Sequence, residues 1–368
     1  MRKQNVYLSM AILVIASLVL AACAPAATAT QAPTQPPPEP TAVPPTDVPE
    51  PAVGSAEHPI KVLFVPSVDA QVIVAGGDIM KTALEDATGL TFEVSVPTSY
   101  AATIEEICAS PTDTMAFIPA LGYALASNLC GVDVAFKAVR FGFDVYWAQI
   151  LVARDSPYQT LADLAGKKWG YGDVGSTSGY MVPLVMLQEA GVTPGEEVQT
   201  GGHNQSAQAV YNGEVDFATT FYSPPTLVDT GAVAWEEGQD PEIPADLISS
   251  CGLNADKSAL VCGNYRVRDA RANIREAAPD VIQKVRILMI SPPIPNDTLS
   301  FGPDFPADVR AQIEEALVAF ATTEEWAASI GSQDFYNWTG LNPATDAEYD
   351  FVRSMIAATG LTLEDLGQ

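Results

Sequence analysis

Strand-like and helix-like stretches alternate along the part of the chain that follows residue 57. Short apolar runs have the length of buried strands, and longer stretches between them space their apolar residues as amphipathic helices do. The strand-like runs are 60–65, 92–96, 115–118 and 147–152, and the helix-like stretches include 79–88 and 104–110. This alternation predicts an α/β fold with largely parallel sheets. Roughly 310 residues follow position 57, too many for one compact lobe, so two domains are expected.

The N-terminus has the pattern of a bacterial lipoprotein signal. Arg2 and Lys3 precede an apolar run that ends at Leu20, and two alanines and Cys23 follow. The run is short and one-sided for a membrane span. We therefore predict a signal peptide at 1–22 and acylation of the Cys23 thiol, which would tether the body of the protein outside the cytoplasmic membrane. The alternative is an ordinary signal peptide that is cut nearby.

Residues 23–57 are rich in proline, threonine and alanine and contain almost no large apolar side chain. Such a composition offers no surface from which to build a core. We predict that this segment is a disordered stalk with polyproline II character, which gives the folded body reach above the membrane.

A small-residue stretch, 172–179, opens directly onto a helical apolar pattern that ends at Gly191. The first N–H groups of a helix have no internal partner and lie at the positive end of its dipole, so such a start can bind an oxyanion. The hydroxyls of Ser176, Thr177 and Ser178 add side-chain donors. The alternative is that Ser176 or Ser178 is only an N-cap, as in most capped helices.

Three further motifs follow this stretch in order. They are Gly-His at 202–203, Gly-Glu-Val-Asp-Phe-Ala at 213–218 and Ser-Pro-Pro-Ile-Pro-Asn-Asp at 291–297. Together with 176–183 they resemble the substrate-binding proteins of phosphate, phosphite and phosphonate ABC transporters, the phosphonate-binding family of type II periplasmic binding proteins. The resemblance runs from about residue 60 to the C-terminus, with a departure between residues 223 and 280.

The resemblance implies a type II periplasmic-binding-protein fold, an α/β architecture with two Rossmann-like lobes joined by a two-stranded hinge. Lobe 1 is expected at 58–149 plus 292–368, and lobe 2 at 150–291. A ligand that contacts both lobes in the cleft favours the closed arrangement over the open one.

The resemblance also implies a function. The chain is expected to be an extracytoplasmic, lipid-anchored binding protein that captures a phosphorus oxyanion (phosphate, phosphite or a small phosphonate) and delivers it to the permease and ATPase of an ABC importer. No enzyme activity, cofactor or metal ion is implied, and the protein is expected to be a monomer. A site for another small anion or heterocycle, of the sulfonate type, and a role as a tethered sensor are the alternatives within this fold.

Ligand-binding roles are implied for residues of both predicted lobes. His203 is expected to donate to the oxyanion, with weaker binding as it deprotonates. Asp297 matches an acidic position that faces the ligand, where a carboxylate accepts from a protonated oxyanion and repels a fully ionised one. The implied site consists of Ser176, Thr177, Ser178, His203, Tyr123, Asp297 and, by a looser match, Tyr100. The alternatives are packing aromatics for the tyrosines, a turn-forming role for Asp297 and a structural histidine at 203.

The chain departs from the family after residue 216. Members that bind aminophosphonates resemble one another in placing an acid shortly afterwards, whereas this chain has no carboxylate at 220–225. Recognition of an aminoalkyl tail is therefore not expected, and Phe221 or Tyr222 is expected to cover a smaller or apolar substituent. A glutamate from the segment 232–260 is the alternative partner for an amine.

Acidic residues outnumber basic ones by 45 to 18, giving a formal net charge of −27. This charge argues against nucleic acid or an anionic membrane surface as a partner. The one predicted link to a membrane is therefore the lipid on Cys23. Most of the carboxylates are expected on the solvated surface, while oriented N–H and O–H donors act on an anion at contact range.

The chain has four cysteines besides Cys23, at positions 108, 130, 251 and 262. An even number in an exported protein indicates disulfides, and four cysteines allow three pairings. Proximity within each predicted lobe favours Cys108 with Cys130 and Cys251 with Cys262. A zinc site is disfavoured because there is no Cys-x-x-Cys spacing and the chain has only two histidines.

An extracellular hydrolase is the remaining alternative. The stretch 175–179 superficially resembles a nucleophile elbow, but that motif needs serine at its centre, where this chain has Thr177. Only His203 is available there as a base, so a catalytic triad is not indicated.

Overall fold

The computed structural model describes residues 50–366. The predicted signal peptide, Cys23 and the predicted stalk up to residue 49 lie outside the described residues. Within 50–366 no helix is both long enough and apolar enough to span a membrane.

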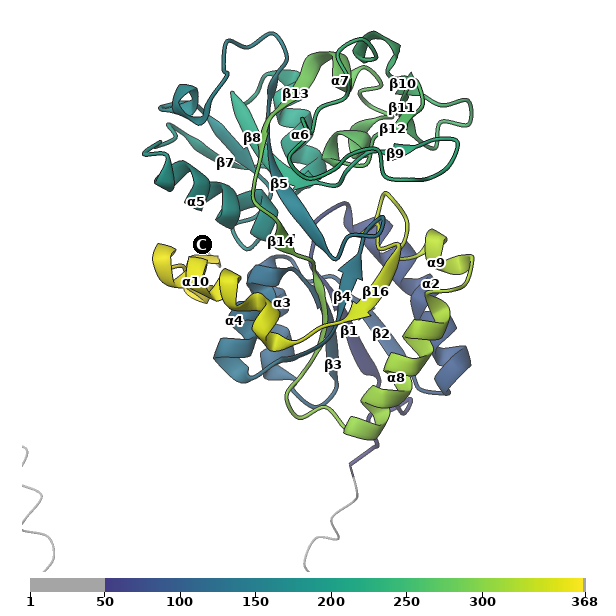
Figure 1. Ribbon diagram of the computed structural model, residues 1–368. Coiled ribbons are helices and arrows are strands. Elements are labelled where there is room, and N and C mark those ends of the chain that lie inside the picture. The colour runs from purple at the N-terminus through teal and green to yellow at the C-terminus, as the bar shows by residue number, and fades with distance from the viewer. Residues whose placement is uncertain (1–49, 367–368) are drawn as a thin grey trace, which may run out of the picture. The chain divides into compact units, whose positions relative to one another are not determined.

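The first lobe is built on a six-stranded mixed sheet (Figure 1). Its strands, in spatial order, are β16 (Gly340–Pro343), β4 (Asp133–Val139), β15 (Thr298–Phe301), β3 (Thr114–Ile118), β1 (Ile60–Phe64) and β2 (Phe92–Ser95). Strand β1 pairs in parallel with both β2 and β3, whereas β15 lies between β3 and β4 and is antiparallel to both. Successive residues of the inner strands are buried, so the side chains on both faces of this sheet are covered, as in a sheet with helices on both sides.

Helices cover both faces of this sheet (Figure 1). On one side lie α2 (Ala70–Thr88), α8 (Ala307–Phe320) and α9 (Glu325–Ala328), and on the other α3 (Tyr100–Ala109), α4 (Ala120–Cys130) and α10 (Asp350–Thr359). The 3₁₀ turn η5 (Asp346–Tyr349) leads into α10, and α11 (Leu363–Leu366) follows it. The Cys108–Cys130 disulfide, with Cα atoms 5.7 Å apart, joins the ends of α3 and α4.

The second lobe has its own mixed sheet, in the order β13-β5-β8-β6-β7. These strands are β13 (Val285–Ile290), β5 (Val145–Ala153), β8 (Phe217–Tyr222), β6 (Trp169–Tyr171) and β7 (Glu197–Gln199). Around it lie η1 (Leu161–Leu164), η2 (Thr177–Met181), α5 (Val182–Glu189), α6 (His203–Asn212), η4 (Ala270–Ile274) and α7 (Val281–Lys284). Pairs that involve β5 are antiparallel, and β6 is parallel to both its neighbours.

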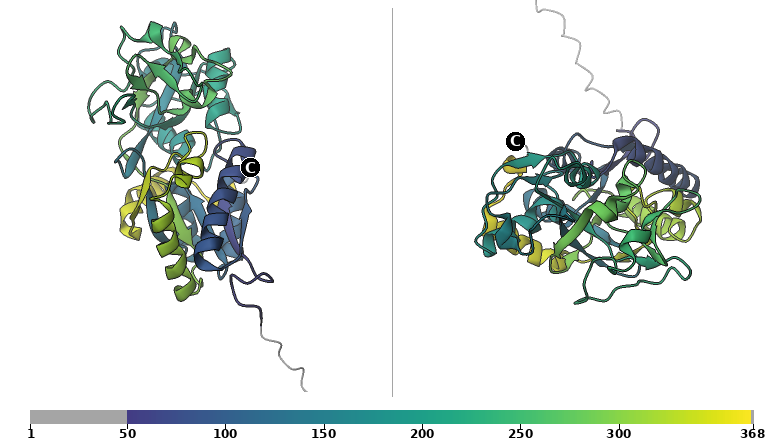
Figure 2. Two further views of the ribbon diagram at one scale, coloured as in Figure 1. Left: turned by 90° about the vertical axis from the view of Figure 1, so that its right-hand side faces the viewer. Right: turned by 90° about the horizontal axis from the view of Figure 1, so that it is seen from above.

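Two chain segments connect the lobes. The long strand β5 belongs to the second sheet, and its first residues pair with β14 (Ile294–Pro295) on the return to the first lobe, with Tyr146 opposite Ile294. These paired segments agree with the two-stranded hinge expected from the sequence. The two lobes and the connection between them can be followed in Figures 1 and 2.

A small antiparallel sheet occupies the segment 224–280, where the sequence predicts a departure from the family pattern. It consists of β9 (Thr226–Leu227), β10 (Gly252–Leu253), β11 (Leu260–Cys262) and β12 (Tyr265–Arg266), with η3 (Ile248–Ser250) beside it. The Cys251–Cys262 disulfide, with Cα atoms 4.0 Å apart, lies in this segment. Both predicted cysteine pairings are therefore present in the structure.

Three predictions change in detail. The sheets are mixed and not largely parallel, because the strands contributed by the hinge and by the chain after it insert antiparallel. Helix α2 begins at residue 70, not 79, and the Asp69 side chain caps it by accepting from the Gln71 N–H at 2.8 Å. The folded body begins before residue 57, since the Gly54 carbonyl accepts from Thr91 N–H and Val53 packs on the core.

Candidate functional site

A small cavity of about 50 Å³ lies between the two lobes. Polar side chains from both lobes line it, and aromatic rings form much of the remaining wall. The polar set is Ser67, Tyr100, Arg140, Tyr146, Ser176, Ser178, His203, Asp297, Gln333, Tyr336 and Asn337, and the apolar set includes Val65, Val68, Phe117, Ile118, Pro119, Phe221 and Phe335. The structure thus brings Ser176, Ser178, His203, Tyr100 and Asp297 of the predicted site together.

The second lobe contributes the predicted small-residue turn. Residues Thr177–Met181 form one π-helical turn that continues into α5, a geometry often found at functional sites. The Ser176 side chain caps it by accepting from the Gly179 N–H at 3.0 Å, so the predicted N-cap role is present. Ser176 and Ser178 nevertheless both line the cavity, so capping and ligand binding are compatible here. Ser178 has 2% of its surface exposed.

Gly179 allows this turn to approach the imidazole of His203. A Cβ atom built on Gly179 would lie 2.8 Å from Ser176 Oγ and 3.2 Å from His203 Cε1. Any side chain would therefore separate the serine turn from the histidine. The small residue that the sequence shows at this position is required by that contact.

His203 is the first residue of α6 and points into the cavity. Its Nδ1 atom is buried and has no hydrogen-bond partner among the described residues, and its ring lies edge-on to Phe221 at 5.2 Å. Burial, and next the charge of Arg140, lower the pKa of His203 to about 4. The imidazole is therefore neutral at neutral pH and donates through one nitrogen only. The loss of ligand binding that was expected when His203 deprotonates is therefore expected near pH 4 and not near pH 6.5.

Two predicted residues lie outside the cavity. The Thr177 hydroxyl accepts from the backbone N–H of Leu121 at 2.9 Å and so joins the serine turn to α4 of the first lobe. The Tyr123 hydroxyl donates to Asp346 at 2.7 Å, and its ring packs against Tyr349 at 4.8 Å. Tyr123 is a fully buried packing aromatic, because α4 turns its ring away from the cavity toward α10. We therefore remove Tyr123 from the candidate site, and Thr177 acts through its contact with Leu121.

Arg140 was not predicted, although it brings the cavity its positive charge. Its Nη2 donates to Asp297 at 2.6 Å, its Nη1 to the Asn296 side chain at 2.5 Å and its Nε to the Tyr336 carbonyl at 3.0 Å. Only 8% of Arg140 is exposed. Arg140 comes directly after strand β4. The one sign of its role in the sequence was that basic residues are few in this acidic chain.

Asp297 is therefore paired. A partly buried carboxylate beside an anion would be repulsive, but the guanidinium of Arg140 neutralises this one. Among the described residues that line the cavity, Arg140 and Asp297 are the two that carry charge at neutral pH, since His203 is neutral. The cavity has no net charge before a ligand enters.

Three phenols face the cavity from the first lobe and the hinge, at Tyr100, Tyr146 and Tyr336. Burial raises the pKa of each hydroxyl above its ordinary value. All three therefore keep their protons. The Tyr336 hydroxyl is engaged, because it donates to the Val65 carbonyl at 2.7 Å.

Asn337 lies on the same wall with an unusual backbone. Its φ is +59°, in the left-handed region where asparagine is tolerated better than most residues. Its side-chain Nδ2 is buried and has no hydrogen-bond partner among residues 50–366. A buried amide donor without a partner is costly unless a ligand or water accepts from it.

Of the two aromatic residues predicted to cover a substituent of the ligand, one lies at the cavity and the other does not. Phe221 lines the cavity against His203. Tyr222 is fully buried and packs against Trp147 and Trp235 in the core of the second lobe. Its place on the opposite face of β8 follows from the alternation of a strand.

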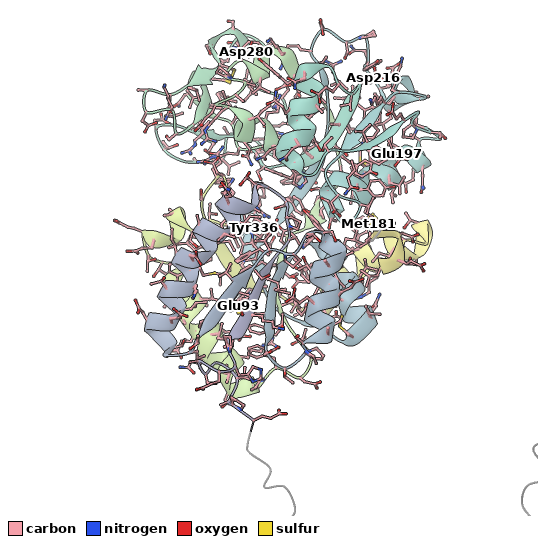
Figure 3. All side chains as sticks on the ribbon, turned by 180° about the vertical axis from the view of Figure 1, so that it is seen from behind. Glu93, Met181, Glu197, Asp216, Asp280 and Tyr336 are labelled. Atoms are coloured by element: carbon pink, nitrogen blue, oxygen red, sulfur yellow. A yellow bond between two sulfur atoms is a disulfide. The ribbon has the colours of Figure 1, made fainter. Side chains whose placement is uncertain are left out.

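Close contacts cross from one lobe to the other around the cavity. The His203 backbone N–H donates to the Ser67 carbonyl at 3.3 Å. A Cβ atom on Gly175 of the second lobe would lie only 2.5 Å from the Cβ of Tyr100 in the first. The lobes therefore meet in a closed arrangement, in which Figure 3 shows Tyr336 at their boundary.

The site is built for binding. It offers neutral N–H and O–H donors, one guanidinium and one carboxylate acceptor, and no nucleophile with an adjacent base in a triad arrangement. Within residues 50–366 no cluster of His, Cys, Asp and Glu side chains is placed to hold a metal ion. Such a donor set suits a small anion that also carries a hydrogen-bond donor.

The chain is similar to known proteins. A family model described as "ABC transporter, phosphonate, periplasmic substrate-binding protein" matches residues 62–349. Over 323 residues the chain is 27% identical to the phosphate-import protein PhnD of Mycolicibacterium smegmatis, covering 82% of this chain and 86% of that protein.

Two solved structures share the fold. A binding protein component of an ABC phosphonate transporter from Pseudomonas aeruginosa has a TM-score of 0.60 at 16% identity, with 82% of this chain and 86% of that one covered. PhnD1 of Prochlorococcus marinus, solved with methylphosphonate, has a TM-score of 0.59 at 13% identity, with 82% and 98% covered. These similarities confirm the predicted type II periplasmic-binding-protein fold.

Proposed function

The chain belongs to the family of periplasmic substrate-binding proteins of phosphonate ABC transporters, and from that premise we propose that its interlobe cavity binds a small phosphorus oxyanion. Members of this family are extracytoplasmic carriers, and the chain is a binding protein and not an enzyme. The relatives named for phosphate import and for a methylphosphonate complex support this ligand class.

The observation that carries the proposal is the set of donors aimed at one small volume. Ser178, the neutral imidazole of His203 and the amide of Asn337 converge on it with Arg140. Donors fixed by packing stabilise an anion without the cost of reorienting on binding. The cavity, of about 50 Å³, is small, and this favours a compact anion over a larger ligand.

Asp297 sets the protonation state of the preferred ligand. Arg140 donates to one of its oxygens, and the carboxylate keeps the capacity to accept a hydrogen bond from the ligand. An oxyanion that keeps an acidic hydroxyl satisfies this acceptor, whereas a fully ionised one faces it with like charge. Phosphite, phosphate and methylphosphonate each have such a singly protonated form.

The size and lining of the cavity also affect whether a ligand with an aminoalkyl tail can bind. Phe221 closes the second-lobe side of the cavity, and Asp297, the carboxylate that lines it, is held by Arg140. An ammonium group would have to compete with that guanidinium. We propose that aminoethylphosphonate binds more weakly than methylphosphonate.

Transport from a lipid anchor completes the proposal. Cleavage before Cys23, acylation of its thiol and delivery to a permease with its ATPase are inferred from the N-terminal pattern and the family. The lobes, at 58–149 plus 292–368 and at 150–291, would open about the β5–β14 hinge to admit the ligand, and a single copy of the chain suffices to form the cavity.

Calorimetric titration tests the ligand class. The protein is unfolded and refolded to remove carried-over ligand, then titrated with phosphate, phosphite, hypophosphite, methylphosphonate, aminoethylphosphonate, sulfate and taurine. We expect saturable binding of one of the small phosphorus oxyanions and a weak response to the aminated compound. Binding of sulfate or taurine alone would move the protein to the sulfonate type, and silence across the panel would contradict the proposal.

A further inference from the structure

The cavity wall formed by residues 333–337 is held from the opposite lobe. Gln333, Phe335, Tyr336 and Asn337 line the cavity and belong to the first lobe. The groups that hold the start of this loop are arginines of the segment 224–280 in the second lobe. We name residues 333–337 the wall loop.

Arg275 makes the strongest of these contacts. Its Nη1 and Nη2 donate to the two oxygens of Asp334 at 2.6 and 2.8 Å, which is a bidentate ion pair. Arg275 has 6% of its surface exposed, while the Asp334 side chain is partly open to solvent. The pair forms only when the lobes meet, because its partners belong to different lobes.

The neighbouring side chain, Gln333, is held from the same direction. Its Oε1 accepts from Arg266 Nη2 at 2.9 Å and from Arg268 Nη1 at 3.2 Å, and its Nε2 donates to the Val267 carbonyl at 3.2 Å. Every hydrogen bond of this amide group therefore crosses between the lobes. The Arg268 guanidinium also lies 4.4 Å from the centre of the Phe141 ring of the first lobe.

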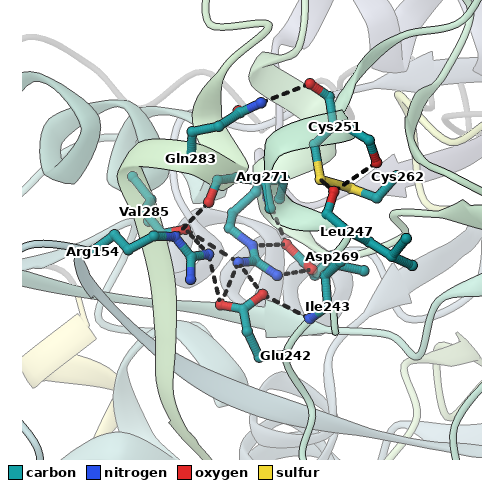
Figure 4. Close-up of a disulfide and its surroundings, with 12 residues drawn as sticks. Arg154, Glu242, Ile243, Leu247, Cys251, Cys262, Asp269, Arg271, Gln283 and Val285 are labelled. Carbon is teal, nitrogen blue, oxygen red and sulfur yellow. Dashed lines mark hydrogen bonds and ion pairs between the residues drawn. A yellow bond between two sulfur atoms is a disulfide. The ribbon is translucent and has the colours of Figure 1, made fainter. Parts of the chain in front are cut away.

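The segment that carries these arginines is itself fixed to the second lobe (Figure 4). Arg271 is 1% exposed and pairs with Asp269 and Glu242. Glu242 also accepts from the Ile287 N–H of β13 at 2.9 Å. The Cys251 carbonyl, next to the disulfide, accepts from the Gln283 side chain at 2.8 Å. The segment that carries the three arginines is therefore held in place by contacts within the second lobe.

We propose that Arg266, Arg268 and Arg275 form a closure clamp, which positions the wall loop and makes ligand affinity depend on contacts that never touch the ligand. The inference rests on the proposed function, since it concerns the same cavity. The clamp stabilises the closed arrangement and presents Tyr336 and Asn337 to the ligand. Apparent affinity scales with the fraction of protein that can close, so a weaker clamp weakens binding. The segment 224–280 thereby gains a role.

The test compares Arg275→Gln, Asp334→Asn and the charge-reversed double variant R275D/D334R with the unchanged protein. Calorimetry measures Kd for phosphate, phosphite and methylphosphonate, and small-angle X-ray scattering measures closure. We expect each single variant to bind on the order of tenfold more weakly, with a more open average form. The double variant should recover most of that loss, because the ion pair is restored with its charges exchanged.

Arg310→Gln is the matched control. Arg310 pairs with Asp133 and Glu314, which lie in the same lobe, so its loss removes a comparable guanidinium without affecting closure. We expect its Kd to stay within about twofold of the unchanged protein.

Unchanged Kd and unchanged scattering in the Arg275 and Asp334 variants would overturn the clamp, as would equal weakening by Arg310→Gln. If Arg275→Gln does not fold, Asp334→Asn carries the decision, because its side chain lies in a loop at the surface. If the unchanged protein binds neither these three anions nor hypophosphite, the proposed function fails. The clamp is then judged separately by whether Arg275→Gln opens the lobes in the scattering experiment.

Discussion

The two faces of the cavity are assembled in different ways. The second-lobe face comes from short local motifs: a serine turn at the start of α5 and a histidine at the start of α6. The first-lobe face gathers single residues from the turn after β4, the hinge, the turn after β14 and the wall loop. The bond from Arg140 to Tyr336 joins residues that are 196 positions apart. A local motif can be recognised in a sequence, whereas a face built from distant single residues becomes visible only in the fold.

Loss of Arg140 should have the largest effect and would test whether the first-lobe face depends on its ion pair. Arg140→Met leaves the partly buried Asp297 carboxylate without its partner, and we expect the free energy of unfolding to fall by about 3 kcal/mol. Anion binding should also be lost. Adding Asp297→Asn should restore much of the stability, which chemical denaturation can measure, but not the affinity. Wild-type stability in Arg140→Met would show that the pair has no structural weight.

His203 provides the matching test on the second-lobe face, through pH. The unfolded chain protonates this group near pH 6.5 and the folded protein only near pH 4, where burial has moved its pKa. Between these values the unfolded state holds more protons, so stability falls as the pH is lowered, by about 3 kcal/mol in all. His203→Gln should remove this part of the pH dependence when unfolding is followed in the absence of anions. Parallel curves for the two proteins between pH 4 and 6.5 would refute it.

Gly175 tests whether the two faces must meet. A methyl group at this position would lie within 2.5 Å of the Tyr100 Cβ, so Gly175→Ala should oppose closure and weaken anion binding by about 2 kcal/mol. Gly252→Ala is the control, since a Cβ there meets nothing within 4 Å. Equal affinities for the two variants would mean that the protein binds its ligand without this approach.

The smallest expected effect separates a cavity residue from a packing one that the sequence could not distinguish. Ser178→Ala should weaken binding by about 1.5 kcal/mol, because a hydroxyl donor to a charged ligand is lost. Tyr123→Phe removes a hydroxyl that serves Asp346 outside the cavity, so it should leave Kd unchanged and lower stability by about 1 kcal/mol. The reverse pattern in calorimetry would return Tyr123 to the site.

The strands and the serine turn could be predicted because their signals are local, whereas the two-lobe fold with its hinge came from the family resemblance. Apolar runs located β1, β2, β3 and β5 closely, and the motif order located Ser178, His203 and Asp297 at the cavity. Tyr123 was misplaced because a family match cannot say which face of a helix a ring occupies. Asn337 was missed because its value depends on a left-handed backbone and an unpaired amide, neither of which a sequence displays.

The position of β15 determines the order in which the exported chain can fold. This strand lies between β3 and β4, inside the first sheet, yet it enters the sequence only after the whole second lobe. The first-lobe sheet therefore cannot be completed until β15 is available to pair with β3 and β4. The second lobe is continuous in sequence and does not depend on β15. Truncation soon after β14 should therefore leave a folded second lobe attached to an aggregation-prone half sheet.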